Sequence, residues 1–513
     1  MRLHHTIAAL AFAVLAGGCA TLPPPEGRTA STALASTSET RLGRVLTPRV
    51  AQQPGKTGIH PLFEPHDAFA ARVLLAAAAE RTLDVQYYIW HGDEVGDLLF
   101  EAAWRAAERG VRVRLLIDDM NTGGLDPVLA ALDAHPRIEV RLYNPFVQRG
   151  SRALAFVTDF RRVNRRMHNK SFTADNQASV VGGRNVGNEY FAAGTGVVFA
   201  DLDVIAVGDA VREVSAEFDL YWNSPSAYPA AGFVGASPDG AALLAARFAA
   251  TRADPDSVAY LEAVRRARVV DQILEDGLPF EWTTARLVHD DPAKTLAETT
   301  RPGDLLFPEL VRTIGRPSKS LDLVSPYFVP GEEGTAALAS LARSGVAVRI
   351  LTNSLSSSDE GVVHAGYAPR RLELLRAGVR LFELRPTAGR DDRGEKPHMG
   401  SSSSAGLHAK TFAVDRQRIF VGSFNFDQRS ALLNTEMGLV IGSPQLAGRL
   451  AEAFDGPIPL SAWEVRIAAD GRSLEWIERR RDGEVRHSTE PGTTWSQRMK
   501  VDFLSILPIE WLL

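Results

Sequence analysis

The feature that most constrains this chain of 513 residues is a short polar motif that occurs twice with the same internal spacing. The first copy runs His168-Asn169-Lys170, then four residues to Asp175, then six to Gly182-Gly183-Arg184-Asn185. The second runs His408-Ala409-Lys410, then four residues to Asp415, then six to Gly422-Ser423-Phe424-Asn425. A single His-x-Lys carries almost no information. Two copies 240 residues apart indicate an internal duplication.

The segments around the motifs repeat at nearly the same interval. Residues 83–90 and 321–328 are apolar runs typical of buried strands, and each is followed by a helical pattern, a glycine and a second strand at 111–118 or 346–352. Strands that alternate with helices in this way favour α/β units on a parallel sheet. The sequence therefore predicts two tandem αβα domains, each with a mostly parallel central sheet, related by a pseudo-two-fold axis.

The N-terminal segment differs from the rest of the chain. Residues 1–19 combine a basic start, a short apolar run and small residues before Cys19, the only cysteine, which is the pattern of a signal peptide with a lipobox-like end. Ordinary secretion or an uncleaved anchor, with Cys19 incidental, is the alternative. Residues 20–58 predict a flexible tether because they are rich in Thr, Ser, Pro, Gly and Ala. We expect the domains to span 59–270 and 271–513, with a boundary placed loosely between 240 and 310.

The spacing within each motif has a chemical rationale. Residues i and i+2 of a strand point to one face, so His168 lies beside Lys170 and His408 beside Lys410. The glycines that follow allow a tight turn, which returns Asn185 or Asn425 to the same pocket. Two imidazoles, two ammonium groups and two amides would then converge on one phosphodiester. Lysines and amides stabilise the charge of pentacovalent phosphorus, while one imidazole attacks phosphorus and the other protonates the leaving oxygen.

Each histidine also needs a carboxylate on its other ring nitrogen to set the tautomer. Glu436, at the start of a strand, is the candidate in the second half. Asp203 is the candidate in the first half, with Asp201 on the same face as the runner-up. Solvated strand-end carboxylates are the alternative for these positions. The remaining motif positions are interpreted as structural rather than reactive: Asp175, Asp415, Gly182, Gly183, Gly422 and Ser423.

The two motifs resemble those of the phospholipase D superfamily, and the resemblance covers the chain from about residue 60 to the C-terminus. It implies two phospholipase D-like domains and a covalent phosphohistidine, with His168 as the nucleophile and His408 as the general acid/base; the sequence alone does not fix that order. Gly183 replaces the serine that is commoner in the family's GSxN turn, which removes one hydroxyl from the pocket.

The sequence around the motifs resembles one group within this superfamily more closely. Residues 83–90, 115–126, 167–177 and 182–191 are similar to the bacterial cardiolipin synthase group, in particular to its C type, which lacks paired N-terminal transmembrane helices. The likeness implies transfer of a phosphatidyl group onto the headgroup hydroxyl of phosphatidylglycerol, with phosphatidylglycerol or phosphatidylethanolamine as donor. No cofactor or catalytic metal is expected. We expect a membrane-associated protein of the bacterial cell envelope, facing the periplasm, and leave open whether an accessory protein takes part.

Three other functions compete with this one. A hydrolytic phospholipase D would use the same residues with water as acceptor. A nuclease is disfavoured by the net charge of -5, by the presence of both motifs in one chain and by the expected lipid anchor. A catalytically dead membrane-binding protein is disfavoured because both motifs are intact.

Three further segments each have two interpretations. Arg161, Arg162, Arg165 and Arg166 form either a positive cluster for anionic headgroups or a solvated loop. Residues 386–406 are either a lid over the site or a disordered insertion. The apolar residues 501–513 either dock on the core or lie in a membrane interface, and we favour docking.

Overall fold

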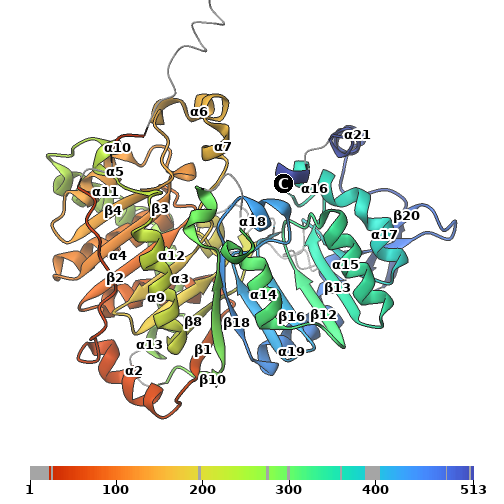
Figure 1. The fold of residues 1–513 in the computed structure, drawn as a ribbon, viewed down its shortest axis with the longest axis horizontal. Helices are drawn as coiled ribbons and strands as arrows, with labels where there is room; N and C mark the ends of the chain where they lie inside the picture. Colours follow the sequence, from red (N-terminus) through yellow and green to blue (C-terminus); the bar gives the residue numbers. More distant parts are fainter. Residues whose placement is uncertain are drawn as a thin grey trace, which may run out of the picture.

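The computed structural model describes residues 22–24, 27–194, 198–267, 269–272, 277–296, 301–358, 361–386, 405–480, 482–507 and 510–512. It shows two α/β domains side by side, each built on a large sheet with helices on both faces (Figure 1). Cys19 and most of the loop at 386–406 lie outside the described residues, so the predictions about lipidation and a lid stay predictions. Among the described residues, every helix is too short or too polar to span a bilayer.

The first domain contains a nine-stranded sheet. Its strands, in sheet order, are β10 (Glu281–Thr283), β1 (Thr57–Leu62), β8 (Asp203–Gly208), β6 (Ala178–Gly182), β5 (Ser171–Ala174), β2 (Thr82–Tyr87), β3 (Arg112–Asp118), β4 (Ile138–Tyr143) and β9 (Ala227–Pro229). Strands β2, β3 and β4 pair in parallel. The other pairings are antiparallel.

The second domain repeats this order in a ten-stranded sheet. Its strands are β11 (Ala285–His289), β18 (Met437–Ile441), β17 (Arg418–Gly422), β16 (Thr411–Val414), β12 (Ser320–Val324), β13 (Ala347–Asn353), β14 (Arg380–Leu384), β19 (Ala462–Ile467), β20 (Leu474–Arg480) and β21 (Gly483–His487). From β1 and β11 to β9 and β19 the two sheets correspond strand for strand. The predicted tandem α/β duplication is confirmed.

The sheets are mixed rather than mostly parallel. In the second domain, too, only β12, β13 and β14 pair in parallel. The reason lies in the motifs themselves, because β5–β6 and β16–β17 are hairpins closed by Asp175-Asn176 and Asp415-Arg416. All four turn residues have φ between 51° and 56°, the geometry of a tight hairpin turn, and a connection that short joins only antiparallel strands.

Helices fill both faces of each sheet. The first domain has α2 (Arg41–Ala51), α3 (Pro65–Ala78), α4 (Glu94–Glu108), α5 (Asp126–Asp133), α6 (Arg152–Thr158), α7 (Phe160–Val163), α8 (Asn188–Phe191), α9 (Asp209–Trp222), α10 (Ala231–Val234), α11 (Gly240–Ala253), α12 (Pro255–Arg265) and α13 (Val269–Gln272). The second has α14 (Leu306–Ile314), α15 (Gly331–Arg343), α16 (Gly361–Tyr367), α17 (Arg371–Arg376), α18 (Gln428–Leu432), α19 (Pro444–Asp455), α20 (Pro457–Ser461) and α21 (Trp495–Ser505). Gly110 and Gly345, just after α4 and α15, have φ of 94° and 93°, so both helices end in the same way.

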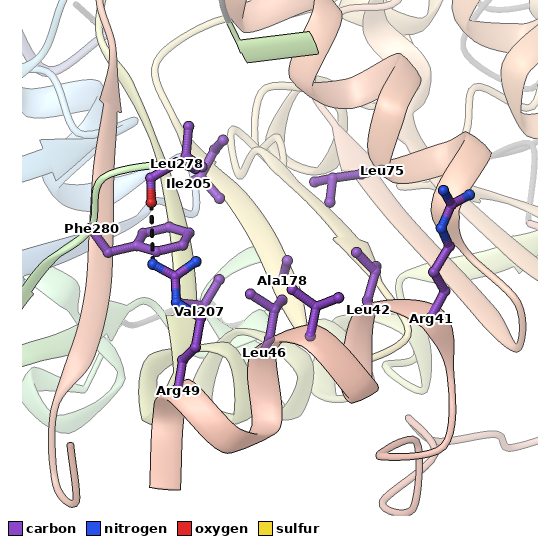
Figure 2. A pocket seen from close by; sticks show the side chains of 11 residues that line it. Arg41, Leu42, Leu46, Arg49, Leu75, Ala178, Ile205, Val207, Leu278 and Phe280 are labelled. Atoms are coloured by element: carbon purple, nitrogen blue, oxygen red, sulfur yellow. Dashed lines mark hydrogen bonds between the residues drawn. The ribbon is translucent and has the colours of Figure 1, made fainter. Parts of the chain in front are cut away.

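Residues 27–58 are packed on the first domain instead of forming the expected tether. Helix α2 begins at the side-chain cap of Thr40. Its Leu42 and Leu46, one helical turn apart, face Leu75, Ala178, Ile205 and Val207 (Figure 2). At the end of α2, the Arg49 guanidinium donates to the Leu278 carbonyl oxygen at 3.3 Å. The polar composition of the segment hid this apolar pair, which is enough to hold one short helix on the sheet.

The two domains share an apolar core where their sheets meet. Val181 and Val204 from β6 and β8 belong to one buried cluster with Val421 and Leu439 from β17 and β18. The chain passes from the first sheet to the second at Thr284, between β10 and β11, which is within the expected range but later than the boundary at 270. The shared core holds the two sheets together on the side where the two motifs meet.

Candidate active site

Each motif histidine is anchored by backbone of the other domain. His168 donates its backbone N–H to the carbonyl oxygen of Thr435 at 2.8 Å. His408 donates its own to the carbonyl oxygen of Ala200 at 2.9 Å, directly after strand β15 (Ala405–Leu407) pairs in parallel with β7 (Val198–Ala200). The anchoring is reciprocal, so the site exists only where both domains meet.

The carboxylates also reach across the domain interface. His168 Nδ1 lies 2.8 Å from Oε2 of Glu436, and His408 Nδ1 lies 2.6 Å from Oδ2 of Asp201. With Nδ1 bound to a carboxylate, Nε2 is the nitrogen that each imidazole offers to a substrate. Glu436 thus lies on the Nδ1 of a motif histidine, but that histidine, His168, belongs to the first half and not to the second.

Asp203, the preferred candidate of the first half, does not contact a motif histidine. Its carboxylate lies 2.9 Å from Arg72 and 3.4 Å from Arg184, in a fully buried ion-pair cluster. The runner-up, Asp201, makes the contact instead, because it follows β7, which runs beside the strand that leads into His408. Equivalent strand positions pointed to Asp203, and no local sequence pattern reveals the two buried arginines that already neutralise its carboxylate.

The two lysines are buried and held in the same way. Lys170 Nζ donates to the carbonyl oxygen of His168 at 2.5 Å, and Lys410 Nζ donates to that of His408 at 2.5 Å. Burial and the nearby charge of Lys410 hold the pKa of Lys170 well below its usual value, although Glu436 acts in the opposite direction. The effect of Lys410 on Lys170 indicates that the lysines of the two domains lie close to each other.

The asparagine turns differ between the halves. Asn185 Oδ1 accepts from the Ile89 N–H at 3.2 Å, and its Nδ2 donates to the Tyr190 hydroxyl at 3.1 Å. Asn425 is also buried, yet its Oδ1 has no hydrogen-bond partner among the described residues. An unpaired buried amide oxygen is unfavourable, so a substrate donor or a water at this position would stabilise the turn.

Gly183 and Ser423 occupy equivalent turn positions with different neighbours. The Ser423 hydroxyl donates to the Glu436 carboxylate and accepts from the Met437 N–H. A Cβ at Gly183 would collide with the carboxylate of Asp201. The departure from GSxN is therefore a steric requirement of the His408–Asp201 pair. Gly182 and Gly422 lie equally close to the strands beside them, where a side chain has no room.

Aromatic rings that the sequence analysis missed form the walls of the site. The ring centroid of Tyr88 lies 4.9 Å from that of His168, and those of Tyr190 and Phe199 lie 5.0 and 5.4 Å from that of His408. Lys170 Nζ lies 5.5 Å from the centroid of Tyr88. Tyr190 follows Asn185 by five residues, so proximity in sequence could have found it, whereas Tyr88 lies 80 residues before His168, in a segment that only its likeness to the family singled out.

The electrostatics favour an anion in this pocket. Burial and Lys410 lower the pKa of His408 to about 3, and burial with both lysines holds that of His168 well below its usual value. Burial raises the pKa of Glu436 to about 7. Near neutral pH both imidazoles are therefore neutral, and the lysines oppose their protonation. A phosphodiester anion bound beside them would raise the histidine pKa values.

The two motif aspartates hold backbone, as expected of structural residues. Asp175 Oδ1 accepts from the N–H groups of Arg81 and Thr82 at 2.7 and 2.9 Å. Asp415 Oδ1 accepts from Lys319 and Ser320 at 2.7 and 3.0 Å. Each carboxylate thus ties its hairpin turn to the start of the central strand, β2 or β12.

The arginine cluster before His168 does not form a free cationic patch. Arg166 is buried against Asp118 at 2.7 Å, and Arg162 pairs with Asp159 at 2.6 Å. Arg165 donates to the Lys294 carbonyl oxygen at 2.8 Å. These guanidiniums fix the segment that leads into the motif instead of pointing at a ligand.

One group with metal-ligand chemistry lies at the rim. Nitrogen and oxygen atoms of His91, Asp93 and Glu189 come within 4.8 Å of one another. Asp93, however, already accepts from the Gly96 and Asn188 N–H groups at 3.0 and 2.7 Å, and His91 lies 3.3 Å from Glu189. These contacts brace the starts of α4 and α8 beside Asn185.

Two carboxylate-bound imidazoles and two lysines from duplicated domains converge in one buried site, which is the arrangement of the phospholipase D-like class of enzymes that act on phosphodiesters. A family model described as "Cardiolipin synthase, PLD-like domain" matches residues 74–222 and 310–457. The chain is also 46% identical over 476 residues to cardiolipin synthase C of Escherichia coli K12, covering 92% of this chain and 100% of that one. The chain therefore belongs to the cardiolipin synthase family of phospholipase D-like enzymes.

More distant relatives agree with this placement. A cardiolipin synthase of Staphylococcus aureus Mu50 is 27% identical over 399 residues, covering 77% of this chain and 65% of that one. The crystal structure of phosphatidylserine synthase of Haemophilus influenzae Rd KW20 matches with a TM-score of 0.56 at 14% identity, covering 92% of this chain and all of that one. The latter similarity supports the fold.

Proposed function

We propose that this enzyme makes cardiolipin by moving a phosphatidyl group from one phospholipid onto the headgroup hydroxyl of phosphatidylglycerol. The observation that carries the proposal is the reciprocal pairing of His168 with Glu436 and of His408 with Asp201 around Lys170 and Lys410. Such a site suits an anionic diester, with one neutral imidazole to attack phosphorus and a second imidazole to carry the proton. The 46% identity to a protein named cardiolipin synthase C supports this choice of lipid.

In the first step, His168 Nε2 attacks the phosphorus of the donor lipid. The bond from phosphorus to the headgroup oxygen breaks as His408, protonated once the anionic diester has raised its pKa, gives its Nε2 proton to that oxygen. Lys170 and Lys410 stabilise the equatorial oxygens, and Glu436 stabilises the N–H at Nδ1 of the phosphorylated imidazole. The product is a phosphatidyl group on His168 and a free headgroup alcohol.

In the second step, the hydroxyl of phosphatidylglycerol takes the place of that alcohol. His408 Nε2 accepts its proton while the oxygen attacks phosphorus, the P–N bond breaks and the neutral His168 returns. Tyr88, Tyr190 and Phe199 line the imidazoles with apolar surface. Exclusion of bulk water by these rings favours a lipid alcohol over hydrolysis.

A lipid product assay tests the proposal. The wild type, His168→Ala and a control variant His487→Ala, which changes a half-exposed histidine on β21, are incubated with phosphatidylglycerol with or without phosphatidylethanolamine, and the products are identified by mass spectrometry. Cardiolipin formed by the wild type and by His487→Ala, but not by His168→Ala, is the expected result, and the lipid requirement identifies the donor. Phosphatidic acid as the sole product would replace transfer by hydrolysis, and no lipid turnover would overturn the choice of substrate.

We further propose that the protein works at the membrane of the bacterial cell envelope on its periplasmic side, anchored by lipid on Cys19. The sequence of residues 1–19 supports this location. Metabolic labelling with an alkyne fatty acid tests it, since label in the wild type and none in Cys19→Ser is expected. Label in both variants, or in neither, would contradict the anchor.

A further inference from the structure

Helix α21, near the C-terminus, exposes a stripe of large apolar side chains. Trp495, Met499, Phe503 and Ile506 are 70%, 46%, 64% and 81% exposed, and Leu507 beside them is exposed as well. Intervals of four, four and three residues place these side chains on one face of a helix. Scattered exposed apolar residues are normal in proteins, but a contiguous set marks an interaction surface.

Residues outside the stripe hold α21 on the domain. On the opposite side of the helix, the buried Val501 and the partly buried Leu504 pack against Leu355 and Ala365. The helix begins with a capping box, in which Thr494 and Gln497 each satisfy a backbone N–H of the other. One face is thus fixed to the domain, which leaves the other face presented to its surroundings in a set orientation.

The chain after α21 reaches toward the part of the second domain that contributes to the site. Figure 1 shows α21 above α16 at the upper edge of the second domain, with the C-terminus drawn between α21 and α18. The short helix η6 (Glu510–Leu512) follows α21, and Arg429 on α18 donates to the Leu512 carbonyl oxygen at 2.9 Å. Because α18 follows the Asn425 turn, this contact joins the segment after α21 to the part of the chain that carries Asn425.

We propose that the exposed face of α21 docks on a phospholipid bilayer, with Trp495, Met499, Phe503 and Ile506 at the boundary between headgroups and acyl chains. The inference deepens the proposed function and rests on it, because it names the surface that brings the site to a bilayer lipid. Tryptophan suits this boundary, since its apolar ring carries a polar N–H.

The charged residues beside the stripe are two basic and one acidic. On the helical projection Arg498 and Lys500 lie on opposite sides of the stripe, and Asp502 lies at its edge between Arg498 and Trp495, so the three together carry one net positive charge. Lysine and arginine next to an inserted helix attract anionic headgroups such as that of phosphatidylglycerol. A second copy of the chain fits less well, because a stripe one helix wide is small beside the roughly 800 Å² that each partner of a standard protein complex buries.

Vesicle binding tests the inference directly. The full chain is prepared in a Cys19→Ser background so that no covalent lipid contributes, and the triple variant Trp495→Ser, Met499→Ser, Phe503→Ser is compared with its parent on phosphatidylglycerol vesicles. A matched control changes three exposed leucines elsewhere, Leu220→Ser, Leu243→Ser and Leu460→Ser. We expect the α21 variant to bind vesicles at least tenfold more weakly, with the control within twofold of the parent. Equal binding by all three proteins would overturn the inference.

Two further measurements separate docking on a bilayer from misfolding of the variant and from dimerisation. A rescue variant with leucine at positions 495, 499 and 503 should bind vesicles as the parent does, because insertion needs apolar area rather than particular side chains. Turnover of a short-chain, water-soluble phosphatidylglycerol should stay unchanged in the α21 variant, since the site is intact. If no variant turns over either lipid while the difference in vesicle binding persists, the proposed function fails and the docking surface stands. A dimer of the parent that the α21 variant loses would instead assign the stripe to a second copy.

Discussion

The two half-sites share their backbone contacts and differ in the carboxylate that faces each histidine. Burial raises the pKa of both carboxyl groups, but His408, Lys410 and Arg184 together lower that of Asp201 to about 2. Glu436 keeps a pKa raised to about 7. The His408–Asp201 pair therefore keeps one charge state near pH 7, whereas the His168–Glu436 pair gains or loses a proton near that pH. Duplication supplied the geometry twice, and the surroundings then made the two halves chemically unequal.

The largest expected effect comes from removing either histidine. His168→Ala and His408→Ala should each lower kcat/KM by about 10³-fold or more, because each step uses both imidazoles. Trapping the covalent intermediate with a labelled donor lipid then distinguishes the roles of the two histidines. Labelled enzyme is expected from His408→Ala given a donor with a good leaving group, and none from His168→Ala.

The position of the label decides the order of the two roles. Peptide mapping of the trapped enzyme should place the phosphoryl group on His168. If the label maps to His408 in a His168→Ala background instead, the assignment of nucleophile and acid is reversed while the overall chemistry stays the same.

The carboxylates come next, and they should differ in pH dependence more than in rate. Asp201→Asn and Glu436→Gln are each expected to lower kcat/KM by roughly 10²-fold through loss of histidine orientation. In the wild type, Glu436 must be ionised to stabilise the Nδ1 proton of phosphorylated His168. kcat/KM should therefore rise with pH through about 7, the pKa of Glu436 in the folded protein.

The pH profile of kcat/KM from pH 5 to 9, measured with a soluble substrate, tests this difference between the two carboxylates. We expect Glu436→Gln to lose the rise near pH 7 and Asp201→Asn to keep it. The reverse outcome would mean that the group that titrates near pH 7 lies in the His408 half of the site.

The smallest effects are expected at the hairpin aspartates, which are structural in both halves. Asp175→Ala removes the acceptor of the Arg81 and Thr82 N–H groups, of which that of Thr82 is buried, so the free energy of unfolding should fall by roughly 1–3 kcal/mol. Asp415→Ala, at a more exposed turn, should cost about 1 kcal/mol. Urea denaturation measures both, with turnover per folded molecule as the control. A large loss of turnover without a loss of stability would give either aspartate a catalytic part.

The sign of the pH effect at Asp415 follows from its contacts. Against the effect of burial, N–H groups of Ser320 and Lys319 lower the pKa of Asp415 to about 2. Its contribution to stability should be complete above the unfolded pKa of about 3.9 and be lost as the pH falls through about 2. The Asp415→Ala variant should lack that acid-sensitive component.

The motifs predicted which histidines and lysines form the site, but they did not predict which carboxylate binds each histidine. Identical spacing was enough to bring His168, Lys170, His408 and Lys410 together, because strand alternation and hairpin turns are local rules. The choice between Asp201 and Asp203 depended on Arg72 and Arg184, which are distant in sequence and whose ion pairs no local pattern announces.

The fold, too, was predicted where it depends on local patterns and not where it depends on contacts between distant segments. The strand–helix repeats predicted two α/β domains, and the glycines that end α4 and α15 lie where the repeat placed them. The packed helix α2 within the expected tether depended on two leucines meeting one patch of the sheet. The crossing of each carboxylate to the other domain is a property of the interface, which periodicity within one domain does not contain.

The reciprocal anchoring of His168 on Thr435 and of His408 on Ala200 has a consequence for how such an enzyme arises and how it can be divided. Half a chain would carry a histidine and a lysine without the carboxylate that sets the tautomer, so it would be inert until a second half supplied the missing strand end. By this geometry a chain with one motif could work only as a pair of subunits, and a chain that carries both motifs makes that pairing permanent. Once both halves shared one polypeptide, each was free to diverge, and Gly183 opposite Ser423 is the trace of that freedom.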